Sequence, residues 1–493
     1  MKYTSTRDKS LRINASEAIV KGISDDGGLF VPLVIPRLEN INELVDLTYN
    51  ELAYEVMKLY LTDFQEDALR EIIAKAYDHK FEGEDIAPLK KVGEDYFLEL
   101  YHGPTFAFKD MALSILPHLL KESVKIQKID KELLILTATS GDTGKAALEG
   151  FADVEGTSII VFYPMDGVSK IQKLQMTTQN ENNTCVFGIK GNFDDAQTGV
   201  KEIFNDKELK EKLLDNNFIL SSANSINIGR LIPQIVYYFY SYIKLLKLGE
   251  INEGEDINIS VPTGNFGNIL AAFYAKEMGL PINKLVCASN DNNILTDFFN
   301  TNIYDKRRDL ELTSSPSMDI LVSSNLERLL YHLNDDEELI KEAMENLNNE
   351  GLYEVQDMDI SDFYANFARE EEVRDEIERV YKRYSYLIDT HTAVASKVYT
   401  KYRYEYRDRK KAIIVSTASP FKFPRTVAES IDIDTAGKDE FDIIEELGKK
   451  TGLDVPARIK SLKDKKVIHD RTVDKTKMKS VILDFLELGV KDD

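Results

Sequence analysis

Lys109 is the residue whose surroundings in the sequence most favour covalent chemistry. It lies in segment 102–110, HGPTFAFKD, where a Gly-Pro turn precedes two phenylalanines, and an apolar pattern that fits a helix follows directly. The positive end of a helix and an apolar lining both disfavour a charged amine, and a neutral amine can attack a carbonyl and hold a Schiff base. The segment therefore predicts a reactive lysine. The alternative is a lysine whose stem packs on aromatic rings while its ammonium group reaches water.

Four other segments share the form of an apolar strand, a small polar loop and a following helix. In an open parallel sheet, such loops gather at the carboxyl edge, where ligands bind. The four loops are 140–144 (SGDTG), 224–230 (NSINIGR), 264–268 (GNFGN) and 416–420 (STASP). We expect all four to lie near Lys109.

Two of these loops are suited to an anion. The helix start after Ser140 and Thr143 offers backbone N–H groups and two hydroxyls to a carboxylate or phosphate, although helix capping explains the same residues. Gly264 and Gly267 would let the backbone approach a phosphate, although an ordinary glycine turn is the alternative. The loop lacks G-x-G-x-x-G and the P-loop lysine, which disfavours a dinucleotide or a nucleoside triphosphate.

The remaining loops complete a set of parts that one cofactor needs. Arg230, with the amides and hydroxyl before it, can bind a second anion bidentately, and the loop at 416–420 is rich in hydroxyls. Pyridoxal phosphate (PLP) needs a lysine for its imine, an apolar contact for its ring, a cradle for its phosphate and a partner for its ring nitrogen. This cofactor would not use the second anion site, at Arg230, which predicts a phosphorylated or carboxylated substrate.

Composition narrows the class of protein. The 493 residues carry a formal charge of −23, which argues against a nucleic-acid-binding surface. Cys185 and Cys287 lie in apolar runs, so buried thiols are favoured over a disulfide, and the histidines show no metal-ligand spacing. The sequence has no apolar leader and no membrane-length apolar run. We expect a cytoplasmic protein without a metal, a membrane or a nucleic-acid partner.

Alternating apolar strands and helices from about residue 91 predict an α/β fold with a parallel sheet. We expect a mainly helical N-terminal domain at 1–90 and a catalytic region at 91–493. Within that region, the pattern indicates a smaller lobe at about 125–225 and an inserted helical region at about 290–385. The charged segments 324–347 and 361–384 are predicted helices of this insertion.

Taken together, these segments resemble the longer bacterial and fungal threonine synthases, within the fold type II PLP enzymes. Three more segments carry the resemblance: 3–7 (YTSTR), 26–32 (DGGLFVP) and 315–320 (SPSMDI). The resemblance implies mostly parallel sheets with flanking helices, and PLP held on Lys109. It further implies cofactor contacts from Phe108, Asp142, Gly264, Asn265, Phe266, Gly267, Asn268 and Thr417, the last at the pyridine nitrogen. Ser140 and Thr143 would bind the substrate carboxylate, and Asn224, Ser225 and Arg230 its phosphate.

The implied reaction converts O-phospho-L-homoserine and water to L-threonine and phosphate, the last step of threonine biosynthesis. Lys109 would move the protons at Cα and Cβ. Another fold type II lyase, such as a serine/threonine dehydratase, and a non-catalytic PLP-binding relative are the alternatives; the complete loop ending at Arg230 argues against the first. The expected partner is the small-molecule substrate, and the expected assembly is a monomer or a weak homo-oligomer.

Overall fold

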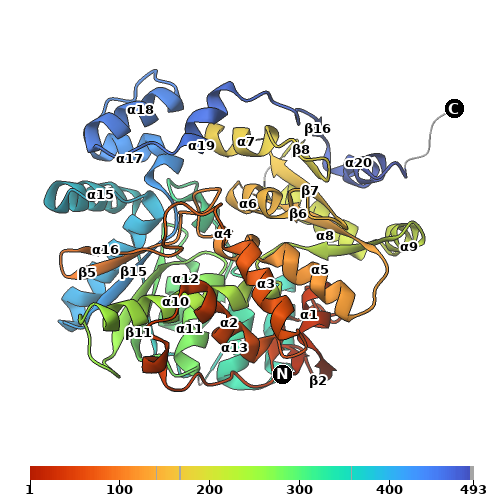
Figure 1. The fold of residues 1–493 in the computed structure, drawn as a ribbon, viewed down its shortest axis with the longest axis horizontal. Coiled ribbons are helices and arrows are strands. Elements are labelled where there is room, and N and C mark those ends of the chain that lie inside the picture. The colour runs from red at the N-terminus through yellow and green to blue at the C-terminus, as the bar shows by residue number, and fades with distance from the viewer. Residues whose placement is uncertain (140, 166–167, 192, 357, 489–493) are drawn as a thin grey trace.

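The computed structural model describes residues 1–493 except 140, 166–167, 192, 357 and 489–493, and has two lobes, each built on a largely parallel sheet (Figure 1). In the larger lobe the strand order is β14-β11-β10-β15-β5-β4, and only β4 runs antiparallel to its neighbour among the described strands. The strands are β4 (Leu89–Val92), β5 (Asp95–Glu99), β10 (Ile257–Pro262), β11 (Ile282–Ser289), β14 (Phe363–Phe367) and β15 (Ala412–Ser416).

The smaller lobe has the strand order β16-β8-β7-β6-β9, and every described pair in it is parallel. Its strands are β6 (Glu132–Ala138), β7 (Thr157–Pro164), β8 (Thr184–Ile189), β9 (Phe218–Ser222) and β16 (Thr472–Val473). Helices α6 (Asp142–Phe151), α7 (Lys170–Thr177), α8 (Phe193–Asn205), α9 (Lys207–Asp215) and α20 (Met478–Phe485) surround this sheet. The parallel architecture predicted from the alternating pattern is therefore confirmed in both lobes.

The first 77 residues pack onto the larger lobe and combine a small sheet with helices. Their elements are β1 (Tyr3–Ser5), β2 (Asp8–Ile13), α1 (Ala15–Lys21), β3 (Phe30–Pro32), α2 (Tyr49–Tyr60) and α3 (Glu66–Ala76). The side chains of Thr48 and Glu51 form a capping box that starts α2. Apolar residues of this segment belong to the same buried cluster as β10 and α11 (Gly267–Glu277). The domain boundary predicted at residue 90 falls inside β4.

The helices that position the site follow strands at their carboxyl ends. α4 (Asp110–Leu113) and α5 (Leu116–Ile126) come after Lys109, α10 (Ile228–Lys247) follows β9, and α11 follows β10. The remaining helices are α12 (Ile294–Thr301), α13 (Leu326–Asn334), α14 (Glu337–Asn349), α15 (Glu370–Tyr384), α16 (Thr390–Tyr406), α17 (Pro424–Ser430), α18 (Glu440–Thr451) and α19 (Ala457–Lys460). Strands β12 (Ile303–Asp305) and β13 (Leu352–Glu354) form an antiparallel pair.

Two details differ from the sequence-based expectation. The helix predicted at 361–384 begins only at Glu370, because residues 363–367 form β14, which pairs in parallel with β11 at the edge of the larger sheet. The smaller lobe, expected at about 125–225, also includes Thr472 and Val473, which add a strand beside β8.

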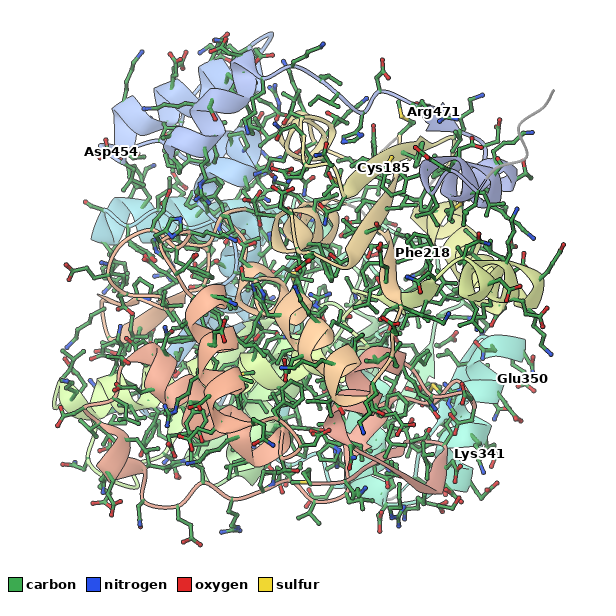
Figure 2. All side chains as sticks on the ribbon, turned by 45° about the vertical axis from the view of Figure 1, so that its right-hand side comes forward. Cys185, Phe218, Lys341, Glu350, Asp454 and Arg471 are labelled. Carbon is green, nitrogen blue, oxygen red and sulfur yellow. The ribbon has the colours of Figure 1, made fainter. Side chains whose placement is uncertain are left out.

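The two cysteines are free thiols. Cys287 is buried as expected, whereas Cys185 is partly exposed and lines a small pocket with Arg471 at the edge of the smaller lobe (Figure 2). Burial raises the pKa of both thiols, to about 11 for Cys185 and about 12 for Cys287, so neither is activated as a nucleophile. Along the described part of the chain, no helix is both long and apolar enough to cross a membrane.

Candidate active site

A cavity of about 880 Å³ is lined by residues of both lobes. The predicted loops gather around it because β6, β9, β10 and β15 each end at its wall, as expected for parallel strands. The predicted site residues that line it are Phe108, Lys109, Asp142, Thr143, Asn224, Ser225, Arg230, Gly264, Asn265, Phe266, Gly267, Asn268 and Thr417. Ser140 lies outside the described residues. These residues, selected from the sequence, therefore line one cavity in the structure.

Backbone contacts fix Lys109 beside the end of β15. Phe108 N–H donates to the carbonyl of Thr417 at 2.8 Å, and Ser419 N–H donates to the carbonyl of Phe106 at 3.1 Å. Phe106 has a positive φ of 61°, an uncommon conformation for a bulky residue. The chain thus turns sharply just before the lysine, and Lys109 and Thr417 line the same cavity.

The Lys109 amine has a lowered pKa. Burial and, to a smaller extent, the charges of Arg230 and Lys422 lower it to about 8 against the opposing effect of the Asp142 carboxylate. The following helix, α4, has only four residues, so its dipole is a minor contribution. The lowered pKa is therefore explained mainly by burial rather than by the helix end.

Asp142 forms a buried ion pair that the sequence did not reveal. Lys422 Nζ lies 2.6 Å from Asp142 Oδ1, and both side chains are almost fully buried. Gln172 Nε2 also donates to Oδ1, at 2.9 Å. Burial alone would raise the pKa of Asp142, but the charges of Lys422 and Lys109 hold it well below its ordinary value. Asp142 is therefore an anion in the cavity wall.

The loop Gly264–Asn268 has the shape of an anion cradle at the start of α11. Phe266 has a positive φ of 62°, which turns the chain into the helix. A Cβ on Gly264 would lie 2.9 Å from the carbonyl oxygen of Ser317, so this position tolerates only glycine without a shift of the neighbouring backbone. Asn268 is 7% exposed, and its Nδ2 has no partner among the described residues. An unpaired buried donor at a helix N-terminus fits an anionic ligand.

Arg230 occupies the first turn of α10 and is 3% exposed. Its Nη1 donates to the carbonyl of Ala223 at 2.9 Å, whereas Nε has no partner among the described residues. Burial lowers its pKa to about 10. Asn227, in the loop before it, caps α10 through its Oδ1 and donates to the carbonyl of Ile19, so this residue is structural. Arg230 is therefore a buried cation with an open donor.

Two further cavity residues, Ser317 and His391, had no assigned role in the sequence. His391 Nδ1 lies 2.8 Å from an oxygen of Asp389, and its Nε2 accepts the backbone N–H of Ser317 at 3.2 Å. These contacts require a neutral imidazole with its proton on Nδ1. The Ser317 hydroxyl then lies 3.2 Å from Asp142 Oδ2 and 3.5 Å from Lys109 Nζ. The segment 315–320 was recognised only through the resemblance.

Comparison with known proteins identifies the family. Two family models match, "Threonine synthase N terminus" at residues 2–77 and "Threonine synthase, C-terminal" at residues 392–476. The threonine synthase of Eremothecium gossypii is 37% identical over 467 residues, which cover 87% of this chain and 89% of that protein. The chain belongs to the threonine synthase family.

Solved threonine synthase structures share the fold over nearly the whole chain. The yeast threonine synthase superposes with a TM-score of 0.87 at 31% identity, covering 99% of both chains. The PLP-bound threonine synthase of Brucella melitensis gives 0.86 at 32% identity, covering 98% of this chain and 99% of that one. The Macaca fascicularis protein called threonine synthase-like 1 is 40% identical over 85% of this chain, but the chain spans only 58% of its length. The fold type II architecture implied by the sequence is confirmed.

Proposed function

We propose that this protein is a PLP-dependent lyase that converts O-phospho-L-homoserine and water to L-threonine and phosphate. The observation that carries the proposal is that one cavity holds two candidate anion sites and a lysine whose pKa is lowered to about 8. One anion site is the cradle at the start of α11, and the other is Arg230 with its open Nε. A cofactor phosphate and a substrate phosphate account for both.

The residues present fit PLP. Lys109 would hold the cofactor covalently through Nζ, and the cradle with the free Nδ2 of Asn268 would bind its phosphate. Phe108 and Thr417 line the cavity on the Lys109 side, and Asp142 lies in its wall. When bound, PLP withdraws electrons from the bonds at the substrate α-carbon and so stabilises the charge left by deprotonation. A hydroxyl at Thr417 need not keep the ring nitrogen protonated, which would moderate this withdrawal.

Lys109 is suited to move protons during the reaction. Once substrate frees its amine, the amine can accept the Cα proton and, after passing that proton on within the site, can accept a proton from Cβ. A pKa of about 8 is close to neutral pH, so the amine can both accept and release a proton. The Ser317 hydroxyl lies 3.5 Å from Nζ, and both residues line the cavity. Phosphate leaves from Cγ, which then gains a proton to become the methyl group; water supplies the hydroxyl at Cβ, and a proton returns to Cα.

The substrate is held at its two ends. Arg230, Asn224 and Ser225 would bind the phosphate, which counters the repulsion of a dianion by a chain of net charge −23. Thr143 would bind the carboxylate at the start of α6. Ser140, proposed for the same role, remains a prediction from the sequence. The expected assembly, a monomer or weak homo-oligomer, remains one too.

The alternative of a serine/threonine dehydratase is not favoured, because an unphosphorylated substrate leaves Arg230 without its anion. Burial accounts for the shift in the pKa of Arg230, with no contribution from a carboxylate of the described residues. The deciding experiment supplies the purified PLP-loaded protein with O-phosphohomoserine and measures phosphate and threonine in equal amounts. Serine and threonine serve as controls, with 2-oxo acid as the readout. Oxo-acid formation from these two without phosphate release from O-phosphohomoserine would replace the synthase with the dehydratase.

A further inference from the structure

Two adjacent tyrosines of α10 converge on one atom of the phosphate cradle. Tyr237 Oη lies 2.5 Å and Tyr238 Oη 2.6 Å from Oδ1 of Asn268. Distances this short are typical of O–H···O hydrogen bonds and are shorter than N–H···O bonds. The atom facing the tyrosines is therefore the amide oxygen, and both hydroxyls donate to it.

This arrangement fixes the direction of the other half of the amide. With Oδ1 held by two donors, Nδ2 of Asn268 must point away from the tyrosines, and it is buried without a partner among the described residues. Asn268 lines the cavity at the second residue of α11. A buried donor left unpaired is costly, and an anion at this helix N-terminus would relieve the cost.

Each tyrosine hydroxyl has one proton to donate. Tyr237 Oη also lies 3.1 Å from Oε1 of Gln234, whose Nε2 donates to the Arg230 carbonyl at 2.8 Å, but the contact to Asn268 Oδ1 is the shorter one and takes that proton. Burial raises the pKa of both phenols well above the ordinary value, so neither ionises near neutral pH. One helix thus carries Arg230 and, two turns later, the pair that directs Asn268.

We propose that Tyr237 and Tyr238 are positioning residues that orient the Asn268 amide so that Nδ2 donates to the phosphate of the cofactor. The inference rests on the proposed function for the identity of that cofactor. Because each hydroxyl alone can still hold Oδ1, loss of one should be tolerated. Loss of both frees the amide to rotate and present its oxygen to the phosphate, which repels it.

The test measures binding rather than turnover. PLP-free protein is titrated with PLP and with pyridoxal, which lacks the phosphate, for Tyr237→Phe, Tyr238→Phe and the double variant. We expect each single change to weaken PLP binding by less than about threefold and the double change by about tenfold or more, with pyridoxal binding unchanged. Tyr242→Phe is the matched control: this buried tyrosine of α10 donates to the carbonyl of Glu255, away from the cavity.

The Asn268→Asp variant provides a second test, since it keeps the side-chain shape and replaces the donor Nδ2 with an acceptor oxygen. It should weaken PLP binding at least as much as the double variant while sparing pyridoxal. Equal losses for PLP and pyridoxal, or an unchanged PLP affinity in the double variant, would overturn the proposal. Threonine formation is measured separately on the unaltered protein, so that a failed synthase assay alongside the expected binding pattern would reject only the proposed reaction.

Discussion

Replacement of Arg230 is the perturbation that most directly tests the substrate. Its guanidinium is 3% exposed, with one nitrogen bound to the Ala223 carbonyl and Nε open. A charge-assisted hydrogen bond contributes about 1.5–3 kcal/mol, which corresponds to roughly a ten- to hundredfold change in kcat/KM. Arg230→Leu should therefore lower kcat/KM for O-phosphohomoserine by about that factor.

The structure also predicts what this change should leave intact. Burial already disfavours the Arg230 charge, as its lowered pKa shows, so an apolar replacement of similar size should cost little folding stability. Cofactor absorbance should persist, because Arg230 belongs to the substrate site rather than to the cradle. Arg230→Lys is the companion variant. It keeps the positive charge but cannot bind a phosphate bidentately, so we expect an intermediate loss of kcat/KM.

Steady-state kinetics with phosphorylated and unphosphorylated substrates provides the assay. Any side reaction with serine or threonine should be nearly unchanged in Arg230→Leu, because these substrates carry no phosphate. The reasoning is refuted if both substrate types lose activity equally, or if neither does. A loss confined to O-phosphohomoserine assigns the open guanidinium to the substrate phosphate.

The other predictions concern the lysines and the cradle. Lys109→Ala should abolish turnover, and borohydride-trapped cofactor should map to the Lys109 peptide; a label on another lysine would reject the assignment. Covalent capture of PLP by the cofactor-free protein should speed up as pH rises and level off above about 8, because the amine is protonated and unreactive below its lowered pKa; a rise that continues toward pH 10 in stopped-flow absorbance would contradict this. Gly267→Ala should weaken PLP retention with little change in melting temperature, since its Cβ would meet only ordinary contacts at 3.5 Å, whereas Gly264→Ala should also lower the melting temperature. Lys422→Met should destabilise the fold by about 3–5 kcal/mol in denaturant titrations, and adding Asp142→Asn should recover part of the loss; no recovery would mean that the pair is not coupled.

The parts of the site that sequence could predict are those carried by local patterns. A strand, a small polar loop and a helix recur at 140–144, 224–230 and 264–268, and parallel pairing then brings such loops together whatever the details of packing. The contact between Ser317 and His391 spans 74 positions in the chain, and nothing in either local sequence signals the other. β14 was missed because its five residues are bordered by charged segments whose helical pattern dominated a longer window.

Lys109 and Lys422 show a difference within the site that the local sequence does not predict. Lys109 follows Phe108 and Lys422 follows Phe421, so an apolar setting alone selects both. The Lys422 ammonium faces the Asp142 carboxylate at 2.6 Å, the Thr105 carbonyl at 3.1 Å and Gln175 Oε1 at 3.3 Å. Three acceptors thus match its three N–H groups. Around Lys109 Nζ, the hydrogen bond found among the described residues is a long one of 3.5 Å, to a neutral hydroxyl. The reactive amine is thus the partly buried lysine that has few acceptors, a distinction set by residues distant in the sequence.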